Sequence, residues 1–554
     1  MRNRALAAAR AGHVAEAAAL FEQAAERFPG DGALLNSIGN FHATHGTSND
    51  ALMWFEHATA VAPAAAEPIV NRAIILTRLA RADEALELLQ TRHSAAQTHP
   101  RYWTARGAAE LEAGDLAGAQ CSYTALLQRD PNHPRGLQGR AQVALRRGAS
   151  DAVAWHERGL AAVPGDRHVI AGLAQALLGQ GRLQEAYRYT EALATQVPDW
   201  IEGLEGHAAV RWANGEHAHF ADHYAAAASY APSPALYQSW ATTLAGVDRH
   251  LDAAAIAAKA RSLWPSDRQC ALLEAVYAGA AGDHDRANRL FSVQPIPKEW
   301  RVHVARHRIR MGDPAVADTL LAQVLVDEPE NVAAWALRDV AWRLLGDPRH
   351  QWLSGQEGLV QELPLSLSSI DMGEIIALLE SLHDHSTMPI GQSVKDGSQT
   401  VGALLERMEP AIGILSRTVE KVVAQYRAAL PGYDAAHPLL RHRDAAWQVK
   451  GSWSIRLLGS GRHASHIHPQ GLLSSAAYFV VPPQVDDADR SGWLDLGRPP
   501  ADLGTHLSPM ATIRPRPGYC VLFPSMLFHG TRPIFGGTRM SMAFDVASRR
   551  TRLP

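Results

Sequence analysis

The sequence predicts a multidomain protein with α and β parts, in which an α-helical repeat array precedes a compact β domain with supporting helices. Two observations carry this prediction. Prolines recur at a nearly constant step through the first half of the chain. Short apolar runs separated by glycine, proline and aspartate fill residues 446–546. With 554 residues, the chain is long enough for both parts.

The overall composition excludes several classes of protein. A formal net charge of −3 gives no electrostatic basis for a nucleic-acid or anionic-membrane partner. No apolar run reaches the roughly 18 residues of a membrane span. None of the three cysteines lies in a CxxC motif, which excludes a zinc ribbon and a disulfide framework and favours a reducing compartment. We therefore expect a cytoplasmic protein.

Residues 1–350 carry a repeat of about 34 residues, the period of the tetratricopeptide repeat (TPR), which is a pair of antiparallel helices. Small residues such as Gly39 and Gly107 recur in phase with aromatic residues, and would let the two helices approach closely. Proline would end the second helix of each pair. We expect roughly nine or ten repeats. The prolines of the period are Pro29, Pro63, Pro131, Pro164, Pro198, Pro232 and Pro265.

This half resembles TPR proteins, and the resemblance implies a right-handed superhelix whose concave face binds a protein or peptide. The alternatives are a spacer or an oligomerisation surface. The basic segment 301–310 would be either a docking face or a solvated helix face. The chain begins inside the first repeat, which suggests a missing first helix or an unusual cap.

The repeat ends near residue 350, and we expect a linker at 351–364 followed by a second domain at 365–554. Helical patterns predict supporting helices within 365–440. Seven or eight short strands within 441–554 predict a compact sandwich or jelly roll.

The stretch "HASHIHPQG" places His466 and His468 two residues apart in β-rich sequence. With 27 histidines in the chain, one such pair is expected by chance. Two further pairs, at 217–219 and 383–385, lie in helical sequence, where residues two apart point away from each other. On a strand, residues two apart share one face, so both imidazoles can converge on one metal ion.

A third ligand and an anion site are predicted near the end of the chain. His529 follows an apolar strand and a turn. In "RMSMAFDV" the alternation sends Arg539, Ser541 and Ala543 to one face, and we expect the opposite, apolar face to pack on helices. A buried guanidinium without an anion costs several kcal/mol, so an inward Arg539 requires a carboxylate partner.

Residues 389–546 resemble the 2-oxoglutarate- and Fe(II)-dependent oxygenase family that often follows TPR arrays. The resemblance rests on "PIGQSVKDGSQT", "SWSIRL…HASHIHPQGLLSSAAYFVVP", "GWLDLGRP" and "GYCVLFPSMLFHGTRP…TRMSMAF". It implies a double-stranded β-helix (jelly-roll) fold with Fe(II) as cofactor and 2-oxoglutarate and O2 as cosubstrates. His466 and His529 would be metal ligands, Arg539 and Ser541 would hold the C5 carboxylate of 2-oxoglutarate, and Tyr478 would assist. The "HIHPQG" segment is also similar to the metal loop of protein prolyl hydroxylases.

The third metal ligand departs from the two-histidine, one-carboxylate pattern of the wider superfamily. We favour His468 as a neutral third ligand. Alternatively, His466 and His529 bind the metal with water and His468 lies behind them, or Asp495 supplies a carboxylate. His463 is expected at the surface or behind a ligand. Three histidines by themselves would suit zinc, copper or nickel equally well, so iron follows from the resemblance.

The function predicted from the sequence is that of a dioxygenase that hydroxylates a protein or peptide recruited by the TPR array. The alternative is a non-catalytic TPR scaffold with a degenerate, metal-free barrel. A cupin-type three-histidine dioxygenase that uses no 2-oxoglutarate would leave Arg539 and Ser541 without a role.

Overall fold

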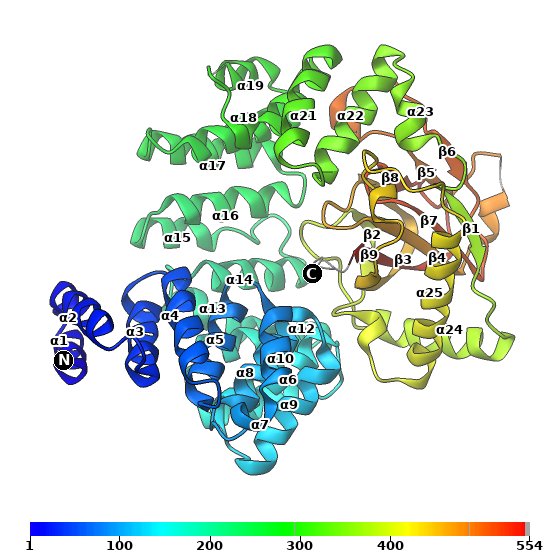
Figure 1. Cartoon of the computed structure of the whole chain (residues 1–554). Helices are drawn as coiled ribbons and strands as arrows, with labels where there is room; N and C mark the ends of the chain where they lie inside the picture. Colours follow the sequence, from blue (N-terminus) through cyan, green and yellow to red (C-terminus); the bar gives the residue numbers. More distant parts are fainter. Residues whose placement is uncertain (293, 487, 549–554) are drawn as a thin grey trace. The chain divides into compact units, whose positions relative to one another are not determined.

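The computed structural model describes residues 1–292, 294–486 and 488–548 (Figure 1). The chain divides into two compact units, Met1–Gly172 and Leu173–Pro554. None of the described helices combines the length and apolar character needed to cross a lipid bilayer.

The first unit consists of helices that pair with their neighbours in sequence. The pair α1–α2 shows that the first repeat does contain a first helix. The helices are α1 (Arg2–Arg10), α2 (Val14–Arg27), α3 (Gly32–His45), α4 (Ser48–Val61), α5 (Ala66–Arg78), α6 (Ala82–Thr91), α7 (His93–Ala96), α8 (Tyr102–Ala113), α9 (Leu116–Arg129), α10 (Pro134–Arg146) and α11 (Ala152–Ala162); α12 (Arg167–Gly179) runs through the boundary.

The proline period follows the helix ends, as predicted. Pro29, Pro63 and Pro131 each lie two residues after the last residue of α2, α4 and α9. The predicted close approach of paired helices is also confirmed. A Cβ atom on Gly39 of α3 would lie 2.6 Å from the Phe55 ring of α4, so only glycine fits there.

The second unit begins with further helix pairs of the same kind. They are α13 (Leu183–Gln196), α14 (Ile201–Ala213), α15 (His223–Tyr230), α16 (Pro234–Ala245), α17 (His250–Leu263), α18 (Arg268–Ala280), α19 (His284–Phe291), the 3-10 turn η1 (Lys298–Trp300), α20 (Arg301–Arg310), α21 (Pro314–Asp327), α22 (Val332–Leu345) and α23 (Arg349–Ser354). Proline again follows α13, α15 and α17 by two residues.

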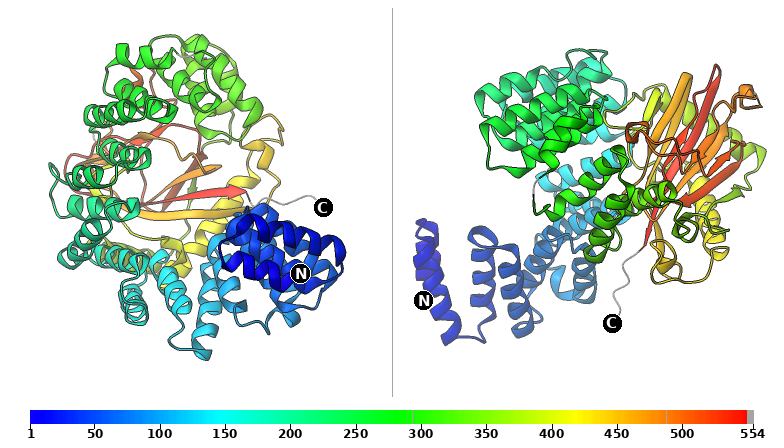
Figure 2. Two further views of the ribbon diagram at one scale, coloured as in Figure 1. Left: turned by 90° about the vertical axis from the view of Figure 1, so that its left-hand side faces the viewer. Right: turned by 90° about the horizontal axis from the view of Figure 1, so that it is seen from above.

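The rest of the second unit is an antiparallel sheet that forms a half-barrel, shown from two directions in Figure 2 in orange and red. Its order is β1-β7-β4-β9-β3-β8-β5-β6, and β2 also pairs with β3. The strands are β1 (Gln361–Pro364), β2 (Val394–Gln399), β3 (Trp447–His466), β4 (Leu473–Val480), β5 (Leu494–Leu496), β6 (Ala511–Ile513), β7 (Tyr519–Pro524), β8 (His529–Thr531) and β9 (Thr538–Ser548).

The long strand β3 belongs to two runs of strands. Its first part, Trp447 to Leu458, pairs with β9, whereas His463 and His466 pair with β8. The β7-β4-β9-β3 run is therefore joined to the β3-β8-β5-β6 run through one continuous strand.

Two supporting helices, α24 (Ser369–His383) and α25 (Pro410–Ala428), pack on one face of the sheet. Their buried residues, including Leu379 and Val419, share a core with Met540, Met542 and Phe544 of β9. This confirms that the apolar face of β9 packs on helices. The residues between these three in sequence therefore point to the other side of the sheet.

The repeat helices of the second unit also pack against the sheet region. Met526 and Phe528, just before β8, lie in one core with buried residues of α18 to α22. Arg306 and Arg310 of α20 both donate to Asp502, in the 3-10 turn η5 (Ala501–Leu503). The basic segment 301–310 thus docks onto this chain's own sheet region, a reading that the sequence had not suggested.

The segment 351–364, expected to be a linker, holds the end of α23 and all of β1. Strand β1 pairs with β7 at the edge of the sheet, from Gln361 opposite Leu522 to Pro364 opposite Tyr519. This segment therefore contributes a strand to the half-barrel.

Replacing Gly39 with alanine tests the close approach of α3 and α4. Alanine favours a helix over glycine by about 1 kcal/mol, but overpacking against Phe55 costs about 1–3 kcal/mol. We expect a net loss of unfolding free energy, measured by urea denaturation. In a Phe55→Leu background the same change should become neutral or stabilising. An equal loss in both backgrounds would contradict this packing explanation.

Candidate metal centre

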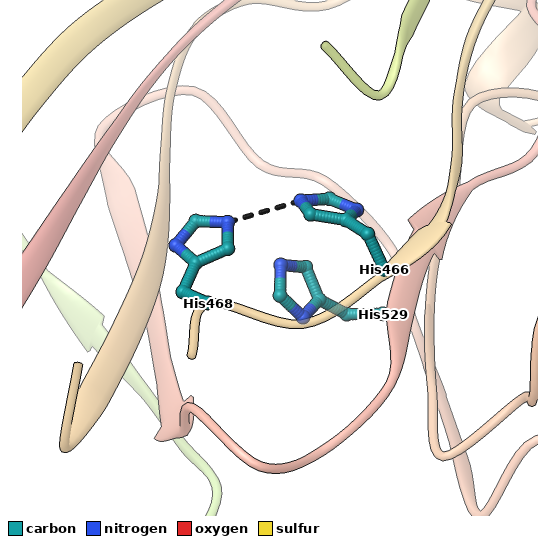
Figure 3. Close-up of side chains that lie close together, drawn as sticks. All are labelled: His466, His468 and His529. Atoms are coloured by element: carbon teal, nitrogen blue, oxygen red, sulfur yellow. Dashed lines mark hydrogen bonds between the residues drawn. The ribbon is translucent and has the colours of Figure 1, made fainter. Parts of the chain in front are cut away.

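Three histidines from two neighbouring strands and the loop after one of them point toward one another (Figure 3). His466 ends β3 and lies opposite His529, the first residue of β8. His468 follows two residues after β3. The candidate ligand nitrogens of the three side chains all lie within 4.8 Å of one another. The backbone register of β3 and β8 thus assembles the three histidines.

Each of the three imidazoles has an acceptor at Nδ1. The Nδ1 of His466 lies 2.9 Å from the Ala464 carbonyl, and that of His529 lies 2.9 Å from the Leu527 carbonyl. The Nδ1 of His468 lies 2.5 Å from a carboxylate oxygen of Asp545. A neutral imidazole that donates through Nδ1–H has its lone pair on Nε2. All three tautomers are therefore set for ligation through Nε2.

The Nε2 atoms of His466 and His468 face each other at 3.0 Å. If both Nδ1 atoms carry protons, two lone pairs meet at this distance, and a cation between them is required, either a proton or a metal ion. Two nitrogens bound at right angles to a metal, each at about 2.1 Å, lie about 3.0 Å apart. The spacing fits two adjacent positions of one coordination sphere.

The electrostatics of the cluster favour neutral imidazoles. Burial, followed by the nearby His468, lowers the pKa of His466 to about 4. Burial, followed by the neighbouring imidazoles, lowers the pKa of His529 well below its usual range. Metal ions bind the neutral form of histidine, so these two side chains are in the ligating protonation state at neutral pH.

Arg539 lies on the same side of β9 as the cluster and is 2% exposed. Its Nη1 lies 3.4 Å from Ser541 Oγ, and its guanidinium lies 5.1 Å from the centre of the Tyr478 ring. Arg539 Nε and the Tyr478 hydroxyl are buried without a hydrogen-bond partner among the described residues. Burial lowers the pKa of Arg539 and raises that of Tyr478 to about 12. The arrangement leaves a buried cation and a hydroxyl donor ready for an anion.

A cavity of about 520 Å³ connects the histidines with Arg539 and Ser541. This volume lies within the range of pockets that hold one small ligand. All three histidines line it, together with Asp545. The residues predicted for the metal and for the anion therefore face one shared space.

Asp495 lies outside the histidine cluster. Its carboxylate accepts from Arg532 and from Thr512, and pairs with Arg498 at 3.0 Å. The register of β5 places Leu496 opposite His529, so Asp495 points to the other face of that strand. His463 lies behind the cluster, with its Nδ1 3.2 Å from Ser393 Oγ and its ring stacked on His466.

The sequence analysis missed two residues that contact the cluster. Asp545 continues the Arg539, Ser541, Ala543 series on β9, and this alternation was the signal that could have identified it. Its carboxylate also accepts from Ser474 at 3.2 Å. Ser393, whose Oγ lies 3.4 Å from His466 Nε2, comes just before β2 and carried no local signal.

Comparison with known families agrees with this geometry. Residues 451–545, which contain the three histidines, Arg539 and Asp545, match the model of the family described as "Putative 2OG-Fe(II) oxygenase". The C-terminal part of the chain thus carries a domain of this description.

The N-terminal region matches TPR proteins. It is 29% identical over 116 residues to human tetratricopeptide repeat protein 7B, a match that covers 21% of this chain and 14% of that protein. A TPR protein from Parabacteroides merdae is 19% identical, covering 44% of this chain and 97% of that one, with a TM-score of 0.35. PilW, a type IV pilus biogenesis factor, is 19% identical, covering 36% and 93%, with a TM-score of 0.34.

Asp545→Asn tests how the metal site is held. Loss of the carboxylate removes the strongest acceptor for His468 Nδ1 and should weaken metal binding by roughly ten- to a hundredfold. Calorimetric titration of the full chain with Co(II) measures this change. Asp495→Asn is the matched control and should bind as wild type does. The opposite pattern, with binding lost only in Asp495→Asn, would move ligation to Asp495.

Proposed function

We propose that this protein is a 2-oxoglutarate- and Fe(II)-dependent dioxygenase that hydroxylates a protein or peptide substrate. The observation that carries the proposal is the pair of complementary sites in one cavity: three Nε2 atoms aimed at one point, and a buried guanidinium that lacks a carboxylate partner among the described residues. The family match over 451–545 supports the same chemistry.

His466, His468 and His529 would hold the metal through Nε2. When bound together, Fe(II) and 2-oxoglutarate supply the activation of O2, with decarboxylation of 2-oxoglutarate to succinate and CO2. The chain's own residues bind and orient. The Ala464 and Leu527 carbonyls and Asp545 hold the three Nδ1 protons, and thereby keep the Nε2 lone pairs directed into the cavity.

Arg539 would anchor the far carboxylate of 2-oxoglutarate. Support comes from its full burial, its unpartnered Nε, and the unpartnered Tyr478 hydroxyl beside it. A bidentate contact with a carboxylate satisfies both nitrogen donors of a guanidinium edge. Ser541 Oγ, on the same face of β9, offers one further donor. Without an anion, this cation costs stability, which a purely structural role would not require.

We also propose that the half-barrel is a double-stranded β-helix, or jelly roll. The two runs β7-β4-β9-β3 and β3-β8-β5-β6 support it, since they are the two sheets of a jelly roll joined by one shared strand. In this fold the metal ligands would come from β3, the loop after it and β8, on the inner side.

The TPR-like repeats support a macromolecular substrate, because helical repeats build extended binding surfaces. The alternative of a non-catalytic scaffold requires neither a buried unpaired arginine nor three imidazoles with fixed tautomers. A three-histidine dioxygenase that uses no 2-oxoglutarate leaves Arg539 without a ligand.

Anaerobic titration of the Fe(II)-loaded protein with 2-oxoglutarate tests the proposal. Chelation should produce a metal-to-ligand charge-transfer band in the visible. In Arg539→Gln the band should need at least about thirtyfold more 2-oxoglutarate, because about 2–3 kcal/mol of charge-assisted hydrogen bonding is lost. Arg532→Gln, an arginine paired with Asp495 instead, is the matched control.

The same variants separate a functional from a structural arginine. Removing an uncompensated buried charge should leave the unfolding free energy of the ligand-free protein unchanged or raise it. No band in wild type, or an undiminished band in Arg539→Gln, would overturn the proposed function.

A further inference from the structure

We propose that helix α16 of the repeat array, with the turn after it, forms the part of the active-site wall that receives the substrate, as an extended polypeptide whose inserted side chain is uncharged. This inference rests on the proposed function and names its substrate class. It begins with the cavity itself, whose lining includes Ala245, Gly246 and Asp248 as well as the three histidines.

The α16–α17 turn is joined to the segment before β2 by two specific contacts. The Gly391 backbone N–H donates to the Gly246 carbonyl at 3.0 Å. Lys395 Nζ lies 2.6 Å from Asp248 Oδ2. A Cβ atom on Gly246 would lie 2.9 Å from Ile390 Cγ2, so the two segments are in close contact. The repeat array thus supplies a built part of the cavity wall.

One face of α16 leads into this wall. Gln238, Thr242 and Ala245 are spaced by four and three residues, so they lie on one side of the helix. Gln238 and Thr242 are exposed, and Thr242 Oγ1 lies 3.1 Å from the Tyr277 hydroxyl of α18. From Gln238 to Ala245 the helix rises about 10 Å, the length of about three extended residues.

The chemistry of this face suits a polypeptide backbone. An amide and two hydroxyls each donate and accept hydrogen bonds, as the N–H and C=O groups of an extended chain require. The cavity, at about 520 Å³, is too small to admit a folded domain. A protruding segment laid along α16 can reach it with one side chain.

The charged side chains that line the cavity already have partners or a role. Lys395 is paired with Asp248, and Asp545 with His468. Arg539 is the proposed anchor of 2-oxoglutarate. A charged substrate side chain would therefore enter without a counter-ion, at the cost of its desolvation. The cavity thus selects a neutral side chain.

Fluorescent pools of short random peptides test this inference. The pools differ only in the central residue, which is neutral (Asn, Gln, Thr, Pro, Leu), acidic (Asp, Glu) or basic (Lys, Arg). Anisotropy with the full chain, in the presence of Co(II) and 2-oxoglutarate, measures binding. We expect the neutral pool to bind most tightly, and Ala245→Arg to raise its Kd by about tenfold or more.

The control is Ala255→Arg, which places the same side chain on an exposed position of α17 that does not line the cavity. It should bind the neutral pool as wild type does. Equal binding by Ala245→Arg and Ala255→Arg, preference for a charged pool, or binding of no pool would each overturn the inference.

Lys395→Met tests the charge argument separately. It leaves the Asp248 carboxylate unpaired at the cavity wall, so binding of the basic pool should rise by about threefold or more relative to the neutral pool. An unchanged preference would contradict the assignment of this ion pair. Peptide binding is measured without turnover, so a wild type that lacks the charge-transfer band but binds the neutral pool at α16 separates failure of the proposed function from failure of this inference.

Discussion

The alternation of side chains along β9 is the constraint on which the rest of the second unit depends. One set, Met540, Met542 and Phe544, is buried against α24 and α25. The other, which includes Arg539, Ser541 and Asp545, faces the cavity. Because the side-chain period of a strand is two, a shift of one residue would exchange the two faces and bury three polar groups among the helices. The apolar contacts with α24 and α25 therefore hold the polar groups in position.

The polar face is costly to the fold. A buried guanidinium and two lone pairs facing each other at 3.0 Å both destabilise the ligand-free protein. The cost is local to the cavity, whereas the stabilising core lies on the opposite face of the sheet and in the contact of Met526 and Phe528 with the repeat helices. Such separation of a strained site from its supporting core is typical of a ligand-binding centre.

The sequence was most informative where a pattern repeats. The TPR period places seven prolines after helix ends, and the two faces of β9 follow from alternation alone. Contacts between distant segments could not be predicted this way. His468 and Asp545 are 77 residues apart, and Asp248 and Lys395 are 147 apart, so each pair depends on strand register or domain docking. Asp495 was a reasonable candidate ligand until the register of β5 showed which face it occupies.

The central claim is that three neutral imidazoles bind one metal through Nε2. X-ray absorption spectroscopy of the full chain loaded anaerobically with Fe(II) tests it most directly, because imidazole rings give characteristic multiple scattering. The account predicts scattering from three histidines, falling to two in His468→Ala. Iron surrounded by oxygen ligands alone, or a protein that retains no iron, would contradict it.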